Sequence, residues 1–289
     1  MKKIEAFLAI AVMFLCLGSC SDDHSNEGGG GSGTSKFTGN LENCASQTRT
    51  SVSESKSEGV WKMKWSSGDL ILINGVEYKV EAEGSNSFIP KEGSVSQADK
   101  YEAFYPSAMF KGGVRELPSV QKYGKGKVNN LPMYAKSSST TLEFKNLCSV
   151  LAVKVTKGDI ATLKSIRVSS SNRAMCGEFT IKEKTEGKGD YYLALTNGED
   201  KSKSVILKSE EAIALSTEGS VFYVVVPAEE EYDGIKIELS ADGENYSDAM
   251  GVNRSNEKIT LPRNTICSLG YTKDNTLKWF LSTTTSNPL

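Results

Sequence analysis

Cys20 is the residue of this chain that is best placed for covalent chemistry. It follows Leu17, Gly18 and Ser19, and a leucine three residues before a cysteine, with two small residues between, is the bacterial lipobox pattern. In that pattern the cysteine thiol receives a diacylglyceryl group, and cleavage leaves this cysteine at the start of the mature chain. Acyl chains contribute about 0.8 kcal/mol per buried methylene group, so an acylated Cys20 would hold the chain on a membrane. An ordinary signal peptide with an incidental cysteine is the alternative.

The residues before Cys20 have the composition of a secretory signal. Lys2 and Lys3 give a positive start, and the apolar run from Ala6 to Leu17 is too short to span a bilayer as a stable helix. We therefore expect a lipoprotein signal peptide over residues 1–19. The mature protein would then be held by membrane lipid through its acylated cysteine.

Side chains suited to catalysis are scarce. The single histidine, His24, lies in a stretch rich in Ser, Asp and Gly, so the folded body lacks the histidine that Ser-His-Asp or Cys-His catalysis needs. The run Asp242–Asn245 lacks the ligand series of a calcium loop, and the cysteines after Cys20 lack zinc-site spacing. We expect no catalytic, cofactor-binding or metal-binding residues and no enzymatic activity. Two carboxylates that meet from distant positions would be the exception, because such a pair can hydrolyse a glycosidic bond.

Charge and composition exclude two further classes of protein. The chain has 289 residues, and 34 Lys and Arg residues against 36 Asp and Glu give a net charge of −2, which argues against a nucleic-acid binder. Hydrophobic residues make up 38% and charged residues 24%, as in a folded protein rather than a disordered one. Cys148 and Cys267 lie in apolar, strand-like runs and are expected to be buried free thiols, with a disulfide between any two of Cys44, Cys148, Cys176 and Cys267 as the alternative.

The elements expected to carry these residues are short strands. Residues 20–43 read as a flexible tether, with the Gly- and Ser-rich run Glu27–Ser35 inside it. Beyond it, period-two alternation recurs between turn residues, with a hairpin signal at Asn74-Gly75 and no helical stripe. Many short strands at this spacing predict β-sandwiches.

A charged, glycine-bearing stretch near residues 183–190 marks the expected domain boundary. It predicts an N-terminal β-sandwich over residues 44–185 and a C-terminal β-sandwich with a tail strand over residues 186–289. Trp61 and Trp65 would share one face of a strand, where they either pack in the core or stack on a sugar.

A series of motifs, in order along residues 45–272, resembles one known family. Together with the lipobox, this order is similar to that of the Bacteroidales fimbrillin-like proteins, the type V pilin superfamily. The acidic pair after Cys20, Asp22 and Asp23, also resembles the export signal of surface lipoproteins of the Bacteroides group. The motifs are Trp65-x-x-Gly-Asp-x-Ile71, Tyr101-x-Ala-Phe-Tyr-Pro106, Leu131-Pro-Met-Tyr-Ala135, Phe144-x-Asn-x-Cys-Ser-x-Leu-x-Val-x-Val155, Ile166-x-Val-Ser-Ser170, Gly177-Glu-Phe-Thr-Ile181, and Leu261-Pro followed by Cys267-Ser-Leu-Gly270.

The resemblance implies two tandem transthyretin-like β-sandwich domains and a fimbrial structural or adhesive subunit on the outer membrane, which can be released into a fimbrium. It also implies assembly by strand complementation, in which a protease cuts after an arginine, the first strand leaves and a neighbouring subunit supplies a replacement. The matching cleavage position is Arg49, the first arginine of the chain. Residues 36–43 would then be the removable strand, although their few apolar residues make a poor one. The alternative is an edge strand that simply opens the first domain.

The C-terminal tail contains a candidate donor strand. Leu277, Trp279 and Leu281 alternate on one face, as a strand that fills a neighbour's groove requires. This strand either enters another subunit or closes its own domain.

Two other classes of function remain open at this stage. A lipid-anchored surface glycan-binding protein would show exposed aromatic residues on one sandwich face. A hydrolase would show two carboxylates about 5–9.5 Å apart in a cleft. The sequence names neither a host nor a bacterial surface ligand, whereas other fimbrial subunits are the expected protein partners.

Overall fold

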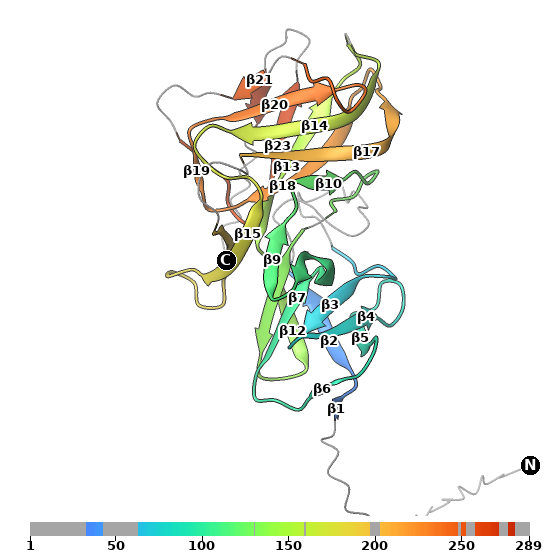
Figure 1. The fold of residues 1–289 in the computed structure, drawn as a ribbon, viewed down its shortest axis with the longest axis vertical. Coiled ribbons are helices and arrows are strands. Elements are labelled where there is room, and N and C mark those ends of the chain that lie inside the picture. The colour runs from blue at the N-terminus through green and yellow to red at the C-terminus, as the bar shows by residue number, and fades with distance from the viewer. Residues whose placement is uncertain are drawn as a thin grey trace, which may run out of the picture. The chain divides into compact units, whose positions relative to one another are not determined.

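The structure, a computed structural model, consists of β-strands and a single-turn 3-10 helix in the part of the chain that it describes (Figure 1). The all-β class that the alternation predicted is therefore confirmed. The described residues are 33–42, 63–129, 131–158, 160–196, 203–247, 250–252, 258–271 and 277–280, with only the backbone described at 250–252, 269–271 and 277–280.

The first half of the described chain closes into a barrel with the strand order β11-β12-β2-β5-β4-β3-β7. The predicted hairpin is confirmed: Asn74 and Gly75 both have positive φ angles, as a tight hairpin turn requires, and they join β3 to β4. Alternate side chains of each strand point into the barrel. The barrel strands are β2 (Phe37–Leu41), β3 (Leu70–Ile73), β4 (Val76–Val80), β5 (Ser87–Pro90), β7 (Tyr101–Tyr105), β11 (Met133–Ser137) and β12 (Thr141–Asn146).

The second half contains two sheets that face each other. One has the order β10-β17-β14-β20-β21 and the other β18-β13-β23-β24. Their strands are β10 (Val120–Lys122), β13 (Cys148–Val155), β14 (Thr162–Ser170), β17 (Ser204–Ala214), β18 (Ser220–Pro227), β20 (Ile235–Ser240), β21 (Met250–Val252), β23 (Ile266–Tyr271) and β24 (Leu277–Phe280).

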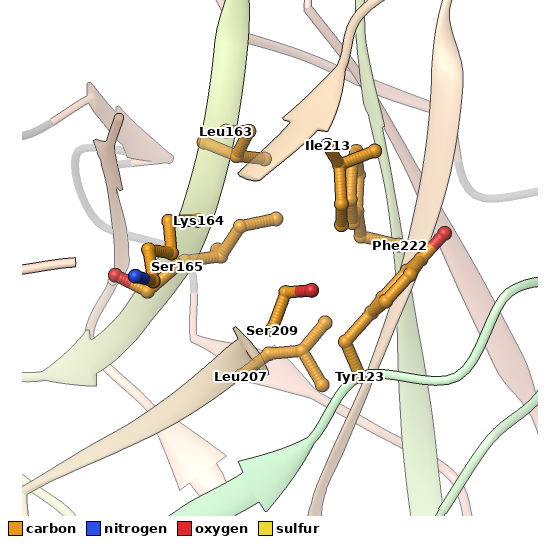
Figure 2. A pocket seen from close by; sticks show the side chains of 9 residues that line it. Tyr123, Leu163, Lys164, Ser165, Leu207, Ser209, Ile213 and Phe222 are labelled. Atoms are coloured by element: carbon orange, nitrogen blue, oxygen red, sulfur yellow. The ribbon is translucent and has the colours of Figure 1, made fainter. Parts of the chain in front are cut away.

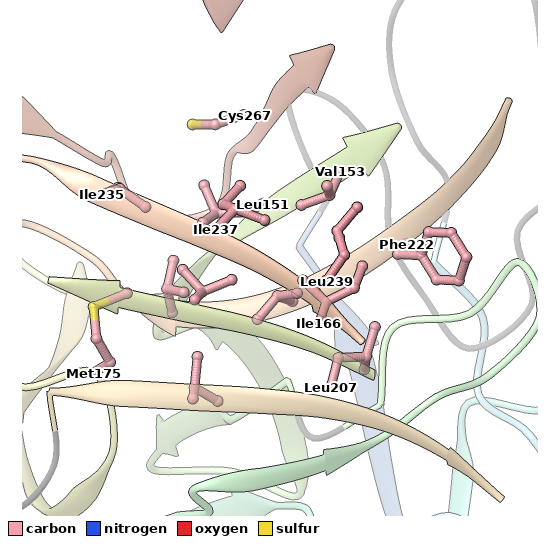
Figure 3. Packing of buried hydrophobic residues seen from close by; sticks show 14 of the residues in the cluster. Leu151, Val153, Ile166, Met175, Leu207, Phe222, Ile235, Ile237, Leu239 and Cys267 are labelled. Carbon is pink, nitrogen blue, oxygen red and sulfur yellow. The ribbon is translucent and has the colours of Figure 1, made fainter. Parts of the chain in front are cut away.

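The core of this sandwich is built from the inner faces of both sheets (Figure 3). Leu151 and Val153 of β13 contribute from one sheet, and Ile166 of β14 with Ile237 of β20 contributes from the other. These aliphatic side chains are buried, and burial of each contributes about 1.5–3 kcal/mol. The facing apolar surfaces therefore explain why the two sheets stack.

Smaller pairings complete the described fold. A separate sheet has the order β16-β15-β9-β8, and two two-stranded ribbons pair β1 with β6 and β19 with β22. A further buried cluster joins Phe104 and Tyr134 of the barrel strands to Phe179 of β15 and Val150 of β13. These elements are β1 (Gly33–Thr34), β6 (Val95–Ser96), η1 (Ser107–Met109), β8 (Phe110–Lys111), β9 (Val114–Leu117), β15 (Gly177–Glu183), β16 (Tyr191–Leu195), β19 (Glu231–Tyr232) and β22 (Ile259–Thr260).

The strand pairing differs from two of the predicted boundaries. β1 and β2 lie within the tether expected over residues 20–43, because Phe37 and Gly39 of β2 point into the barrel. The strands also change partners near Leu147 rather than at 185/186. Before Leu147, β12 pairs with the barrel strands β11 and β2. After it, β13 pairs with β18 and β23, and β14 pairs with β17 and β20. Composition marked a charged turn between β15 and β16, whereas the change of partner falls at Leu147, which joins the end of β12 directly to the apolar run of β13 with no glycine or proline between them. The division into two sandwich domains stays a prediction.

Candidate functional site

β2 closes the barrel between β5 and β12 (Figure 1). Thr38–Leu41 pairs in parallel with Thr141–Phe144 of β12, and Phe37 and Thr38 pair antiparallel with β5. The other six barrel strands stay connected to one another through β11 and β7 without β2. Withdrawal of β2 would therefore leave two unpaired strand edges facing each other. We call the space that β2 fills between β5 and β12 the β2 groove.

Phe37 anchors the start of β2 in an aromatic pocket. Its side chain is 1% exposed, and its ring lies edge-to-face against Tyr78 at 5.1 Å and Tyr101 at 5.0 Å between centroids. The Tyr78 hydroxyl in turn donates a hydrogen bond of 2.7 Å to the carbonyl oxygen of Thr34. Edge-to-face aromatic pairs contribute about 0.5–1.5 kcal/mol beyond their buried area. This pocket therefore holds the first inward position of the strand.

Gly39 occupies the second inward position, where no side chain fits. A Cβ atom built there would lie 2.7 Å from the Phe88 ring and 3.1 Å from the Phe144 ring. Both rings are held by the fully buried Trp65, at 4.9 Å and 5.3 Å between centroids. The Trp65 indole donates a hydrogen bond of 2.7 Å to the Gly39 carbonyl oxygen. Glycine at this position lets the backbone approach the indole closely.

Glu42 follows β2 and forms an ion pair with Arg263, in the turn before β23. Nη1 of Arg263 donates to Glu42 Oε2 at 2.8 Å, and Nη2 donates to Oε1 at 3.0 Å. Glu42 Oε2 also accepts from the backbone amide of Asn146 at 3.1 Å, and Lys145 lies 3.5 Å from Oε1. Arg263 pairs with Asp190 as well. The fork geometry of a guanidinium matches a carboxylate in this two-bond arrangement.

Burial makes this ion pair different from the surface pairs of the molecule. The side chain of Arg263 is 9% exposed and that of Glu42 is 14% exposed. Burial lowers the pKa of the Arg263 guanidinium, but hydrogen bonds and charge from Glu42 and Asp190 outweigh burial, so the net shift is upward. Arg263 is therefore a buried permanent cation whose main partner belongs to the segment that carries β2.

The predicted site residues fall in different parts of the chain. Cys20, Arg49 and Leu281 lie outside the described residues, so acylation and cleavage at these positions stay predictions. Leu277 and Trp279 lie on β24, whose backbone pairs antiparallel with β23 at the edge of its own sheet. In this state the tail strand extends its own sheet, which is the alternative that the sequence left open.

The sequence singled out residues 36–43 as the candidate removable strand but gave no indication of the contacts that hold β2 in the barrel. Residues 36–43 look weakly apolar, yet the F-x-G-x-L alternation of Phe37, Gly39 and Leu41 was a usable signal, because a residue without a side chain at position 39 leaves room for the Phe88 and Phe144 rings. The Glu42–Arg263 pair joins residues 221 positions apart. No local pattern could have indicated it.

The other candidates of the sequence have structural roles where they are described. Trp65 is fully buried, as core packing predicted, whereas Trp61 lies outside the described residues. Cys148 and Cys267 are buried free thiols as predicted, and Cys176 is buried as well.

Both carboxylate oxygens of Asp242 accept hydrogen bonds from residues of the same loop. Oδ1 accepts from the Ser240 hydroxyl at 2.9 Å and from the backbone amides of Glu244 and Asn245 at 2.8 Å each. Oδ2 accepts from the side-chain amide of Asn245 at 2.7 Å. This arrangement is a turn whose acceptors are already satisfied. In the described ranges no three His, Cys, Asp or Glu side chains form a group that could hold a metal ion.

A cavity in the sandwich is too small for an organic ligand. Tyr123, Ser209 and Phe222 point into it (Figure 2), and its volume is about 10 Å³, the space of a single water molecule. The large apolar side chains exposed in the described residues are Val114, Val120 and Val221, none of which is aromatic. Aromatic side chains of the described surface, such as Phe110, Tyr191 and Tyr192, are only partly exposed. None of the helices in the described ranges is long and apolar enough to cross a bilayer.

Comparison with known proteins gives a likeness of fold. No model of a known protein family matches the chain, and no curated protein matches it. A crystal structure of a putative cell adhesion protein from Bacteroides ovatus matches with a TM-score of 0.50 and 16% identity, covering 86% of this chain and 96% of that one. One from Bacteroides uniformis, also a putative cell adhesion protein, matches with a TM-score of 0.47 and 14% identity over 85% and 98%. The resemblance predicted from the ordered motifs is thus confirmed as a shared fold.

Proposed function

We propose that this chain is a surface lipoprotein that serves as a structural or adhesive subunit of a fimbrium, joined to its neighbour by strand complementation. The observation that carries the proposal is the position of β2. It closes the barrel as a strand of its own, and the candidate cleavage site Arg49 lies in the chain between β2 and β3. The shared fold with the Bacteroides ovatus protein supports a role in adhesion.

Cleavage and exchange would proceed in three steps. An arginine-specific protease hydrolyses the peptide bond after Arg49, which leaves β2 attached to the barrel by noncovalent contacts alone. β2 then leaves with the acylated N-terminal fragment, and the edges of β5 and β12 lose their hydrogen-bond partners. An extended strand of another subunit restores those hydrogen bonds.

The tail of this chain is the proposed donor for another subunit. β24 is an edge strand, paired on one side with β23. Its departure breaks one ladder of backbone hydrogen bonds, whereas removal of β13 would break two. An edge position therefore suits a strand that must move to a second molecule.

Proteolysis of the purified full chain tests the polymerising role. Treatment with an arginine-specific protease should release the N-terminal fragment with β2 and produce ladders that resist SDS without heating. Arg49→Lys is the matched control, because it keeps the positive charge but removes the cleavage site, and it should stay monomeric. If the wild-type chain is cut after Arg49 and remains a monomer that retains the fragment, strand complementation is excluded.

A separate variant tests the membrane anchor. Cys20→Ala should release the protein from the membrane fraction into the soluble fraction of cells, because the acyl chains then have no attachment point. Cys16→Ala is the control within the leader and should leave the protein on membranes. Membrane association of Cys20→Ala equal to that of wild type would remove the lipoprotein part of the proposal.

A further inference from the structure

The β2 groove distinguishes among strands by two of its contacts. A strand in this groove must leave the Gly39 position free of side-chain atoms, because the rings of Phe88 and Phe144 already fill that space. It must also supply a partner for Arg263, whose guanidinium lies in the turn before β23 and forms hydrogen bonds to Glu42 at the end of β2. The backbone ladder accepts any extended chain, so these two contacts are the ones that can discriminate.

The steric requirement arises from aromatic rings that have little room to move. Phe88 and Phe144 are both buried against Trp65, and Tyr105 contacts the same indole at 5.3 Å between centroids. A larger residue in place of Gly39 would have to displace this packed cluster, which close-packed interiors resist. An incoming strand therefore needs glycine at this position.

The electrostatic requirement arises from the cost of a buried cation. When Glu42 leaves, Arg263 keeps Asp190, whose side chain is 37% exposed, and loses its two-bond partner. Removal of one partner from a buried ion pair is strongly unfavourable, because the remaining charge is left poorly solvated. An incoming strand with a carboxylate three residues after the glycine would restore the pair.

We propose that the β2 groove accepts a strand of a different polypeptide that carries glycine and, three residues later, Asp or Glu. This inference rests on the strand complementation proposed above and names the chemistry of the partner. The Phe88 and Phe144 rings, packed against Trp65, exclude any residue larger than glycine at this position. Arg263 selects for the carboxylate by forming an ion pair with it.

The tail of this chain does not meet either requirement. With its alternating face turned inward, Trp279 or Leu281 would occupy the Gly39 position. The residue three positions later would be Ser282 or Thr284, neither of which carries a negative charge. A second copy of this chain is therefore a poor donor for the groove. The chain would stand next to a different subunit on this side.

Peptide capture by the full chain, cut after Arg49, tests the selectivity. The probe is a fluorescent peptide of residues 33–42, and its variants are Gly39→Val, Glu42→Gln and the control Thr38→Ser, at an exposed position. A peptide of residues 275–284 represents the tail. We expect Thr38→Ser to be captured like the parent peptide, Glu42→Gln and Gly39→Val about ten- to a hundredfold more weakly, and the tail peptide no better than these.

The outcomes separate this inference from the proposed function. Equal capture of the parent, Glu42→Gln and tail peptides would overturn the selectivity and leave strand complementation in place. Capture of none, with the native β2 fragment retained after cleavage, would overturn both. Within the chain, Arg263→Gln should abolish the preference for the parent over the Glu42→Gln peptide. If that variant does not fold, the peptide series on the native chain decides the matter.

Discussion

β2 and β13 are both interior strands of the described fold, but they are held in different ways. β13 is paired along its whole length with β18 and on its other side with β23, and apolar side chains are buried on both of its faces. β2 has shorter ladders, a glycine at its centre and an ion pair at its end. The sandwich strand depends on apolar area, whereas the barrel strand depends on one aromatic anchor, one close backbone contact and one buried charge pair.

Because of this difference, β13 is held more strongly, whereas the contacts of β2 depend more on which residues the strand carries. Apolar burial is nondirectional, so it holds β13 strongly without specifying much about its sequence. A close contact and a two-bond ion pair add less total energy but reject strands that lack the right residue at one position. A strand that must be exchanged for a specific partner is better held by the second kind of contact.

Truncation of β13 should give the largest loss of stability. Leu151→Ala removes buried side-chain atoms from the sandwich core and should lower the free energy of unfolding by about 2–5 kcal/mol, measured by urea denaturation of the full chain. Val221→Ala on the neighbouring strand is the control, because Val221 is exposed. Similar losses for both variants would show that burial does not explain the stability of β13.

A side chain at the centre of β2 should have a smaller effect. Gly39→Val should destabilise the protein by about 1–3 kcal/mol, because its Cβ meets the Phe88 and Phe144 rings. Gly158→Val is the matched control, since the space around Gly158 is open. Equal unfolding midpoints for the two variants would mean that the Phe88 and Phe144 rings move aside at little energetic cost.

Loss of the negative charge at Glu42 should give the next largest decrease in the free energy of unfolding. Glu42→Gln should cost about 1–3 kcal/mol, because it leaves the Arg263 guanidinium with a neutral partner. Glu210→Gln removes the partner of Lys122 in an exposed pair and should change the stability by less than about 1 kcal/mol. Measurement in 1 M salt sharpens the comparison, since screening weakens the exposed pair more than the buried one.

The buried thiols should have no effect on stability near neutral pH, so their contribution should be visible only at alkaline pH. Burial raises the pKa of Cys148 and Cys267, and raises that of Cys176 to about 11. The ordinary value is about 8.5, so above it the unfolded chain loses thiol protons that the folded chain retains. The unfolded state then binds fewer protons, and stability should fall as pH rises from about 8.5 toward 11.

Alkylation provides the direct measurement of these thiols. Iodoacetamide at pH 8 should leave the three cysteines unmodified in the native protein and modify them in urea, as mapped by mass spectrometry. Rapid native modification of Cys148 would show that the sandwich core opens more readily than its packing indicates.

Local patterns predicted the elements better than their partners. Alternation identified strands, Asn74-Gly75 identified a hairpin, and the apolar run of Cys148–Val155 identified a buried strand. The change of strand partners near Leu147 has a weak local signal, because only Leu147 separates β12 from β13 and neither glycine nor proline lies between them. Alternation also could not show that seven strands of the first half close into a barrel, since open and closed sheets share the same period.

The sequence by itself determined the strand content, the hairpin at Asn74-Gly75 and the lipobox that predicts export and acylation, because each of these depends on residues that are close in the chain. Only the tertiary structure decided that β2 lies between β5 and β12, that Gly39 sits under three aromatic rings and that Glu42 meets Arg263. Those contacts join residues that lie from 26 to 221 positions apart in the chain, and their energies depend on burial and geometry that exist only after the sheets have formed.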